Sequence, residues 1–373
     1  MSRNKNLHKA KNVKNDEFYT LHSDIQAECQ LHSEHFKDKV VYLNCDDVTG
    51  SSVVQEKINK IIEEKNLDKN LLAINDVRTS NFFNVFIENF TEWGLKKLIA
   101  THYGYGKAGF KVEVNGDLNG DGIIDENDVE VFLLEETGDF RDNESIEILK
   151  EADIVVTNPP FSLFREYVDQ LIKYDKKFLI IGSNNATKYK EIFKLIKNNK
   201  IWLGKNTVTK FEQPDKSIKD VFTYWFTNLE FDDRKAELNL THEYDPEKYP
   251  KYDNYDAIIV SKVAEIPKDY YGVMGVPITF LAKHNPEQFE IVGMASGRKE
   301  FDIHPSKRYE NCIQHNPDGT TTNGSKMNTS GTVVLKEPIQ PGTRYYTASN
   351  SNDKLKVLYT HFFIKRKQKE GEE

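Results

Sequence analysis

Blocks of apolar residues alternate with amphipathic stretches over the first two hundred residues of the chain. Continuous apolar, β-branched runs predict buried strands that end near residues 45, 100, 157 and 182. Apolar residues at helical spacing predict helices after Thr20 and over residues 52–66, 82–90, 146–149, 163–173 and 189–197. Ser80 is the expected N-cap of the helix over residues 82–90. Strands and helices thus alternate from Val40 to about Lys200, and this order predicts a doubly wound α/β sheet.

The pattern changes near residue 200. Beyond Trp202 the sequence breaks into shorter β-like pieces punctuated by Pro, Asn and Gly, with a Ser/Thr/Gly/Asn-rich stretch over residues 317–331. We therefore expect one domain over residues 16–200 and an α+β region over 201–373 that also holds the remainder of the sheet. Residues 1–15 are polar and basic, and we expect a flexible arm that is either a solvated tail or a phosphate contact.

Composition narrows the class of protein. The 373 residues carry a net charge of −8, so any affinity for nucleic acid must come from local basic groups. Three widely spaced cysteines form neither a disulfide framework nor a zinc signature, which favours a reducing compartment. No apolar run reaches membrane-spanning length, and the polar N-terminus is unlike a secretion signal. These features predict a soluble cytoplasmic protein.

The most informative motif is Asn158-Pro159-Pro160-Phe161, which directly follows the strand predicted over residues 152–157. In open α/β sheets the carboxyl ends of parallel strands form the ligand-binding edge, so the motif is expected there. The side-chain carbonyl of Asn158 and the backbone carbonyl of Pro159 can accept both hydrogens of an exocyclic amine. Such preorganised dipoles stabilise the positive charge that develops as a methyl group arrives. The prolines restrict the backbone, and Phe161 offers a ring on which a flipped base can stack.

Two alternatives stand beside this interpretation. Pro-Pro turns are common, so the four residues also suit an ordinary turn at the end of a strand. Asn-Pro-Pro-aromatic turns also serve amines of RNA and the side-chain amide of protein glutamine. The position of the motif at the end of a buried strand favours amine methylation over a plain turn.

A Gly/Asp/Asn-rich loop separates two β-like segments, residues 110–114 and 129–134. Its oxygen-bearing side chains follow the spacing of calcium-binding loops, with Gly122 at the sharp turn. The candidate ligands are Asp117, Asn119, Asp121, Ile123 through its backbone carbonyl, Asp125 and Asp128. Strands rather than helices flank the loop, and Asp128 reaches less far than the usual Glu. The pattern therefore leaves two interpretations, a structural Ca²⁺ site or an Asx/Gly-rich β-loop.

Several further segments occur in a characteristic order. They are Asp16-Glu17-Phe18-Tyr19-Thr20, Val40-Val41-Tyr42 with Asn44-Cys45-Asp46-Asp47, Ser80-Asn81-Phe82-Phe83, residues 94–101, Gly138-Asp139-Phe140-Arg141, residues 152–168, residues 249–255 and residues 275–281. Together they resemble the adenine-specific DNA methyltransferases of the EcoRI type. The resemblance covers roughly residues 14–47 and 77–300, and the order and number of segments make it specific.

The resemblance implies methyl transfer from S-adenosyl-L-methionine to adenine N6 in duplex DNA. It also implies a Rossmann-like methyltransferase sheet, a target-recognition elaboration after residue 200, base flipping, and a cognate restriction endonuclease as a further partner. By position, Asn158, Pro159, Pro160 and Phe161 hold the flipped adenine. The implied cofactor-binding residues are Asp16, Phe18, Tyr19 and Thr20 at the methionine end, Cys45, Asp46 and Asp47 after the first strand, and Asp139 and Phe140 at the cofactor's adenine.

The chain departs from the family pattern in three places. Cys45-Asp46-Asp47 replaces the Gly-rich turn of most methyltransferases, as it does in this subfamily. About residues 48–76 are an insertion that begins beside the cofactor segment, and residues after about 297 match poorly. A non-catalytic nucleic-acid-binding or calcium-binding protein on a methyltransferase scaffold is the remaining alternative. The intact Asn158–Phe161 turn argues against it, and the long region after residue 200 favours duplex DNA as the substrate.

Overall fold

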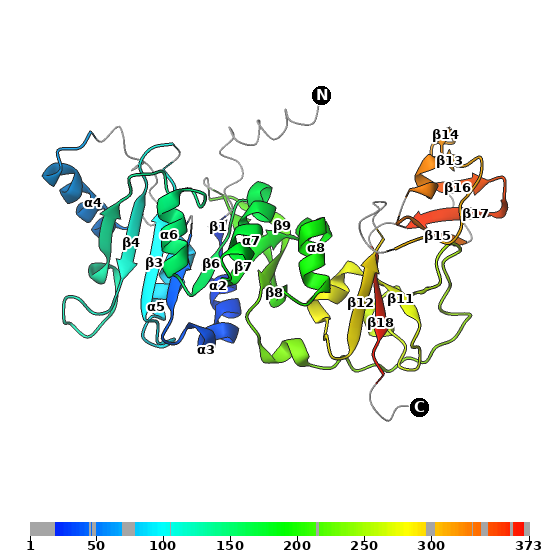
Figure 1. Ribbon diagram of the computed structural model, residues 1–373, viewed down its shortest axis with the longest axis horizontal. Coiled ribbons are helices and arrows are strands. Elements are labelled where there is room, and N and C mark those ends of the chain that lie inside the picture. The colour runs from blue at the N-terminus through cyan, green and yellow to red at the C-terminus, as the bar shows by residue number, and fades with distance from the viewer. Residues whose placement is uncertain are drawn as a thin grey trace. The chain divides into compact units, whose positions relative to one another are not determined.

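The computed structural model describes residues 19–44, 46, 50–68, 79–104, 106–213, 216–295, 303–329, 331–336, 342–358 and 361–368 of the chain. These residues form two compact units (Figure 1). The first unit contains the described residues up to 187 together with 201–231. The second contains residues 188–200 and the described residues from 232 onwards. The chain therefore leaves the first unit, returns to it for two strands, and leaves it again.

A nine-stranded sheet is the framework of the first unit, with the order β1-β8-β9-β7-β6-β2-β3-β4-β5. In chain order the strands are β1 (Tyr19–Thr20), β2 (Val40–Leu43), β3 (Lys97–His102), β4 (Phe110–Val114), β5 (Glu130–Leu133), β6 (Ile154–Thr157), β7 (Lys177–Ser183), β8 (Trp202–Glu212) and β9 (Ile218–Thr227). Strands β7, β6, β2 and β3 are mutually parallel and form the centre. Antiparallel strands extend the sheet at both sides. The strand predicted to end at Thr157 is confirmed as a central parallel strand.

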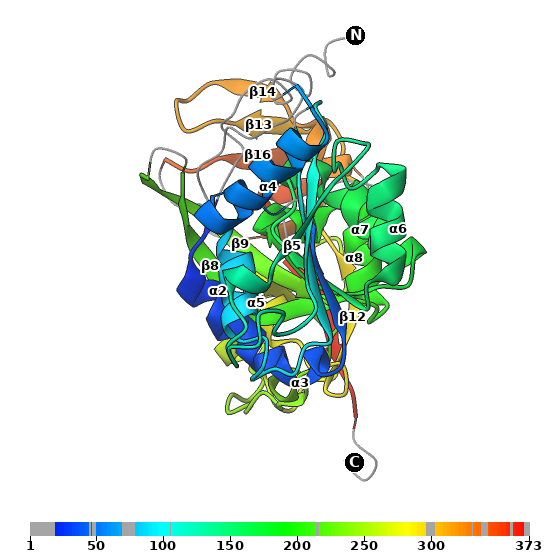
Figure 2. The same ribbon diagram turned by 90° about the vertical axis from the view of Figure 1, so that its left-hand side faces the viewer.

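Helices cover both faces of this sheet (Figure 2). They are α2 (His22–Cys29), α3 (Ser33–Phe36), α4 (Ser52–Glu64), α5 (Asn81–Glu88), α6 (Asn143–Glu151) and α7 (Phe164–Lys173), with short turns η1 (Gln30–His32), η3 (Glu126–Asp128), η4 (Phe161–Leu163) and η5 (Asn184–Lys188). Helices α2, α4 and α5 share one core with Val41, Leu98 and Trp225. On the opposite face α7 packs on β7, and the Phe164 and Phe226 ring centroids lie 5.0 Å apart. Burial on both faces explains the continuous apolar runs of the central strands.

Three elements after residue 188 differ from the sequence interpretation. Strands β8 and β9 belong to the first sheet, whose remainder was expected in this region, but they are 11 and 10 residues long rather than short β pieces. Helix α8 (Lys190–Lys197) was expected to continue the alternation of the first domain. It packs instead against β12 of the second unit, with the Phe193 and Phe362 ring centroids 5.6 Å apart. An amphipathic pattern defines an apolar helix face but not the sheet that covers it.

The second unit contains two further sheets, with the orders β10-β11-β18-β12 and β14-β13-β16-β17-β15. The strands are β10 (Ile258–Ile259), β11 (Val273–Pro277), β12 (Phe289–Met294), β13 (Ile313–His315), β14 (Thr321–Asn323), β15 (Val333–Lys336), β16 (Tyr345–Ala348), β17 (Ser351–Leu358) and β18 (His361–Arg366), with turns η6 (Asp232–Lys235), η7 (Val263–Glu265), η8 (Ile278–Lys283) and η9 (Ser325–Asn328). Among the described residues of both units, no helix is long and apolar enough to span a membrane. The described chain is thus a mixed α/β protein.

Candidate active site

The carboxyl ends of the four parallel strands meet at one edge of the first sheet. Strands β2, β3, β6 and β7 end there at Leu43, His102, Thr157 and Ser183. The Thr157 hydroxyl donates to the backbone oxygen of Asn44 at 2.6 Å and ties the end of β6 to the end of β2. The segments that follow these two strands, beginning at Asn44 and Asn158, therefore start side by side. This is the edge at which open α/β sheets bind ligands.

Asn158-Pro159-Pro160-Phe161 leaves this edge as a turn that leads into α7, as the sequence predicted. Pro159 is buried, whereas Asn158 and Phe161 are partly buried. The Leu163 N–H donates to the Pro160 carbonyl at 2.9 Å and closes the turn. The Phe161 ring and the ring of Phe211 in β8 are nearly perpendicular at 84°, with 6.4 Å between the ring centroids. The aromatic residue of the motif is therefore held against a second aromatic of the same sheet.

Strand β1 brings the predicted cofactor segment to the same place. Thr20 lies opposite Phe211 in the antiparallel pairing of β1 with β8, and Phe211 contacts Phe161. Thr20 is only 3% exposed, and its hydroxyl has no hydrogen-bond partner within the described part of the chain. A buried hydroxyl left unsatisfied costs about 1–3 kcal/mol, so such groups are normally satisfied by water or a ligand. The Thr20 side chain is therefore suited to a polar ligand beside the turn.

Ser80 and Asn81 connect the predicted cofactor segments with each other. The Ser80 hydroxyl donates to Asp46 Oδ1 at 2.6 Å, and Asn81 Nδ2 donates to the Thr20 backbone oxygen at 2.7 Å. Ser80 Oγ also accepts from the Phe82 N–H at 3.1 Å, which confirms the predicted N-cap of α5. Sequence reasoning named Ser80 only as a cap and did not identify the positioning contacts of either residue. Their membership of the Ser-Asn-Phe-Phe segment was the available signal.

A close backbone crossing places Asp139 beside the end of β3. The Gly104 N–H donates to the Thr137 carbonyl at 2.7 Å. Gly138 has a φ of +77°, and a Cβ built there would lie 2.4 Å from the His102 carbonyl oxygen. A Cβ on Gly109 would lie 2.6 Å from the same oxygen. Only glycine fits at these two positions. Because glycine has no side chain, the loop that carries Asp139 can reach the ligand-binding edge.

Asp139 and Phe140 are bound to neighbouring side chains at this edge. The Asp139 carboxylate accepts from Arg141 Nε at 2.7 Å, and its other oxygen lies 2.5 Å from Arg141 Nη2. These hydrogen bonds raise the pKa of Arg141 and keep it charged. Phe140 is 2% exposed. Its ring lies at 76° to the Tyr167 ring, with 5.0 Å between the centroids, and the Arg141 guanidinium carbon is 5.2 Å from its centre. The Asp139 carboxylate also accepts from the Arg141 backbone N–H at 3.0 Å, so side-chain and backbone donors together fix its orientation.

The loop predicted as a calcium site directs its carboxylates to its own backbone. Asp128 is fully buried and accepts from the N–H groups of Leu118, Asn119 and Asp125 at 2.7, 3.2 and 3.0 Å. Burial alone would raise the pKa of Asp128, but these hydrogen bonds outweigh it and the pKa is lowered. Asp117 accepts from two further loop N–H groups. Within the described residues no group of three His, Cys, Asp or Glu side chains forms a metal site. Hydrogen bonds from backbone N–H groups to these carboxylates hold the loop together.

The insertion predicted at about residues 48–76 contains α4, which docks on this loop. Ser51 caps α4 by accepting from the Val54 N–H at 3.4 Å and donates to Glu126 Oε2 at 2.7 Å. Lys57 Nζ donates to two loop carbonyls at 2.7 and 2.6 Å. Val54, Ile58 and Ile62 are buried in the core of the first unit. The predicted amphipathic helix is therefore confirmed and is part of the domain core.

Four of the predicted cofactor residues lie outside the described residues, namely Asp16, Phe18, Cys45 and Asp47. Among the described ones, the structure gathers Thr20, Asp46, Asn158 and Phe161 around the ends of β2 and β6. It places Asp139 and Phe140 beside the end of β3, the next strand of the sheet. The candidate site is therefore one continuous edge rather than scattered positions.

A parallel sheet edge that carries Asn-Pro-Pro-Phe beside a polar segment on the neighbouring strand defines a methyltransferase of exocyclic amines. The comparisons agree with that class. The family model of the adenine-specific methyltransferase EcoRI matches residues 6–74 and 56–367, so this chain belongs to that family. The protein is accordingly an adenine-specific methyltransferase, as the sequence motifs predicted.

Named relatives extend this result. The type II methyltransferase M.EcoRI of Escherichia coli is 47% identical over 330 residues, which cover 80% of this chain and 92% of that protein. M.MpnI of Mycoplasma pneumoniae is 37% identical over 310 residues, which cover 77% of this chain and 84% of that protein. M.MgeORF184P of Mycoplasma genitalium is 36% identical over 309 residues, which cover 77% and 85%. No solved structure gives a significant match.

Proposed function

We propose that this protein transfers a methyl group from S-adenosyl-L-methionine to N6 of adenine at a specific sequence in duplex DNA. The observation that carries the proposal is the position of Asn158-Pro159-Pro160-Phe161 at the end of β6, tied to the end of β2 by the 2.6 Å bond from Thr157 to Asn44. The named relatives are type II methyltransferases, which supports a role in restriction-modification beside a cognate endonuclease.

The residues of this edge fit the cofactor. Ser80 bonds to the Asp46 carboxylate and Asn81 bonds to the Thr20 backbone, so these adjacent residues connect the two segments. The Asp46 carboxylate and the buried Thr20 hydroxyl suit the polar methionine end of the cofactor. Asp139 suits the amine of the cofactor's adenine, and the Gly109 and Gly138 crossing holds it in place. When bound, S-adenosyl-L-methionine supplies a methyl group activated by a sulfonium charge.

Asn158 and Pro159 act on the amine of the substrate. Its lone pair is conjugated into the ring, so the nitrogen is a poor nucleophile until its hydrogens are held out of the ring plane. The Asn158 side-chain carbonyl and the Pro159 backbone carbonyl accept those hydrogens, and their fixed dipoles stabilise the charge that develops on nitrogen. Phe161, braced by Phe211, supplies the ring against which the flipped adenine stacks. Because the prolines restrict the backbone, little reorganisation is needed during the reaction.

This proposal assigns a different function to each of the two units. We assign the nine-stranded sheet to cofactor binding and catalysis on a Rossmann-like methyltransferase plan, with the four parallel strands as its centre. The two sheets of the second unit are assigned to recognition of the DNA target. We therefore assign target recognition mainly to residues after 231, and the membership of β8 and β9 in the first sheet supports this assignment.

The substitution Asn158→Ala tests the catalytic assignment. We expect it to abolish transfer of labelled methyl to duplex DNA and to leave cofactor affinity largely unchanged, because Asn158 acts mainly in the transition state. Asn185→Ala, an exposed residue after the neighbouring strand β7, is the matched control and should retain activity. Turnover is measured with no added metal, and cofactor affinity by calorimetry. Wild-type turnover in Asn158→Ala would refute the role of this side chain.

Base flipping is tested separately with 2-aminopurine at the target adenine. Extrusion from the duplex unstacks the probe and raises its fluorescence, and stacking on Phe161 quenches it again. We therefore expect brighter emission with Phe161→Ala than with the wild-type protein. A probe that stays stacked in the duplex with both proteins would show that the target base is not flipped.

A further inference from the structure

The five-stranded sheet of the second unit is an excursion between two paired strands. The chain leaves β12 at Met294, forms β13 to β17, and returns as β18, which pairs antiparallel with β12. The excursion has a core of its own, which includes Met327, Tyr346, Leu355 and Val357. Strands β13 to β17 therefore form a separate module, which is inserted between two strands of the four-stranded sheet.

One face of this module faces its core and the other faces outward. Gln314 lies opposite Tyr346, and Tyr346 lies opposite Leu355, so these residues mark the core face. Side chains alternate along strands, so their neighbours occupy the outward face. The outward residues are Ile313, His315, Thr321, Asn323, Tyr345, Thr347, Lys354 and Lys356. Ile313 is 45% exposed and both lysines are exposed.

The centre of the outward face is a stack of two rings with a lysine over it. His315 and Tyr345 pair across β13 and β16, with ring centroids 4.4 Å apart and planes inclined by 3°. Lys354 Nζ lies 4.9 Å from the centre of the Tyr345 ring. The His315 Nε2 atom is also within 3.0 Å of the Thr347 hydroxyl, which fixes the orientation of the imidazole. Lysines beside the hydroxyl groups of Tyr and Thr are the groups that commonly contact the phosphates and sugars of duplex DNA.

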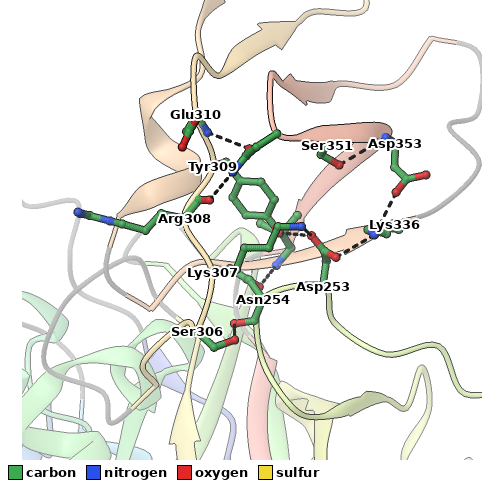
Figure 3. A network of polar contacts seen from close by, with 12 residues as sticks. Asp253, Asn254, Ser306, Lys307, Arg308, Tyr309, Glu310, Lys336, Ser351 and Asp353 are labelled. Atoms are coloured by element: carbon green, nitrogen blue, oxygen red, sulfur yellow. Dashed lines mark hydrogen bonds and ion pairs between the residues drawn. The ribbon is translucent and has the colours of Figure 1, made fainter.

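The other cationic cluster of the module has a different role. Asp253 accepts from Lys307 at 2.7 Å and from the Tyr309 hydroxyl at 2.7 Å, and it lies 3.0 Å from Lys336 (Figure 3). Burial alone would raise the pKa of Asp253, but these hydrogen bonds outweigh it and the pKa is lowered. Asp353 lies 3.1 Å from Lys336 as well. These lysines are neutralised where the module joins Asp253, so they anchor it and are poorly suited to phosphates.

The charge of the module differs in sign from that of the whole protein. Over residues 303–358 the sequence has seven basic residues against four acidic ones, and the balance is still positive when Asp253, the partner of Lys307 and Lys336, is added, whereas the full chain carries −8. We propose that the outward face of β13, β14, β16 and β17 is a DNA-contacting surface. Lys354 and Lys356 contact backbone phosphates, and the His315–Tyr345 stack packs against the adjoining sugars. The inference rests on the proposed function only for the identity of the partner, DNA. Its basis is the charge complementarity between the lysines of this face and the phosphates of DNA.

The test is the salt dependence of DNA binding by the full chain, measured by fluorescence anisotropy without methyl donor. Lys354→Gln combined with Lys356→Gln should lower the slope of log affinity against log salt by about two and raise the Kd about tenfold or more near 0.1 M salt. Tyr345→Ala should raise the Kd with the slope unchanged, because the ring contact is not ionic. Lys248→Gln with Lys262→Gln removes the same charge from side chains that are 77% and 76% exposed. This control should bind like the wild type.

Three results would overturn the proposal. The first is an unchanged slope in the Lys354 and Lys356 double variant while its far-UV spectrum shows a folded protein. The second is an equal loss of affinity in the control, since general charge would then explain the effect. The third is a change of oligomeric state with unchanged DNA affinity, which would identify a subunit interface. Methyl transfer is assayed separately, so DNA binding through this face without methylation would refute the proposed function and leave this inference standing.

Discussion

Substitution of Gly138 by alanine tests how the structure positions Asp139 and Phe140. Gly138 has a φ of +77°, a conformation that costs an alanine about 1–2 kcal/mol. The added Cβ would also lie 2.4 Å from the His102 carbonyl oxygen, whereas ordinary contacts begin at 3.4 Å. Because the oxygen belongs to the end of β3 and is not a flexible side chain, the loop must shift by about 1 Å. Misplacement of that size can cost about a hundredfold in function.

Gly106 is a matched control for the strain alone. Its φ is +89°, and a Cβ built there meets no atom of the described chain within 4 Å. We expect Gly106→Ala to lower the free energy of unfolding by about 1–2 kcal/mol without changing cofactor affinity. Gly138→Ala should lower it by about 2–4 kcal/mol, since strain and overpacking both contribute. It should also weaken binding of S-adenosyl-L-methionine about tenfold or more.

Gly109→Ala separates the clash from the strain. Its Cβ would lie 2.6 Å from the same His102 oxygen, and its backbone needs no positive φ. Urea unfolding gives the stabilities, and titration calorimetry gives the cofactor affinities. Equal cofactor affinity in Gly138→Ala and Gly106→Ala would refute the argument that the crossing at His102 positions the cofactor site.

Two further predictions concern charged groups. The lowered pKa of Asp253 contributes stability above the unfolded-state pKa of about 3.9, and this is lost as pH falls through the folded-state value. Asp253→Asn should therefore lower the free energy of unfolding by about 1–3 kcal/mol at pH 7, a value kept small because solvent screens the half-exposed Lys336. Near pH 3 the loss should be much smaller. Urea unfolding measures both, and equal losses at the two pH values would contradict this prediction. Asp128→Ala should cost about 2 kcal/mol in EDTA without reducing methylation, and unchanged stability would refute the role of Asp128 in holding the loop.

The elements of the first unit were predictable because their signals are local. The N-cap at Ser80, the buried strand before Asn158 and the amphipathic helix α4 each depend on residues within a few positions of one another. Both the hydrophobic periodicity and the capping residue of such an element can be recognised within a short stretch of sequence. The turn at Asn158–Phe161 was predictable for the same reason, since proline restricts its own backbone and ends the strand.

Long-range pairing was not predictable by the same reasoning. The two-residue strand β1 pairs with β8, and this brings Thr20 opposite Phe211 although no local pattern connects them. The helix α8 has a clear apolar face, yet only the fold shows that β12 covers it. Many partners can bury the same apolar face at similar free energy. The sequence therefore defines which face is buried more firmly than it defines the element that buries it.

The sequence by itself determined the class of chemistry and the edge on which it occurs. An Asn-Pro-Pro-Phe turn after a buried strand predicts amine methylation, because the backbone and the acceptors of the motif are adjacent residues. Tertiary structure alone decided how the rest of the site is assembled. Ser80 bonds to Asp46, Gly138 packs on the His102 carbonyl, and Asp253 gathers three donors. These contacts join residues far apart in the chain, so they exist only once the sheets have formed and paired.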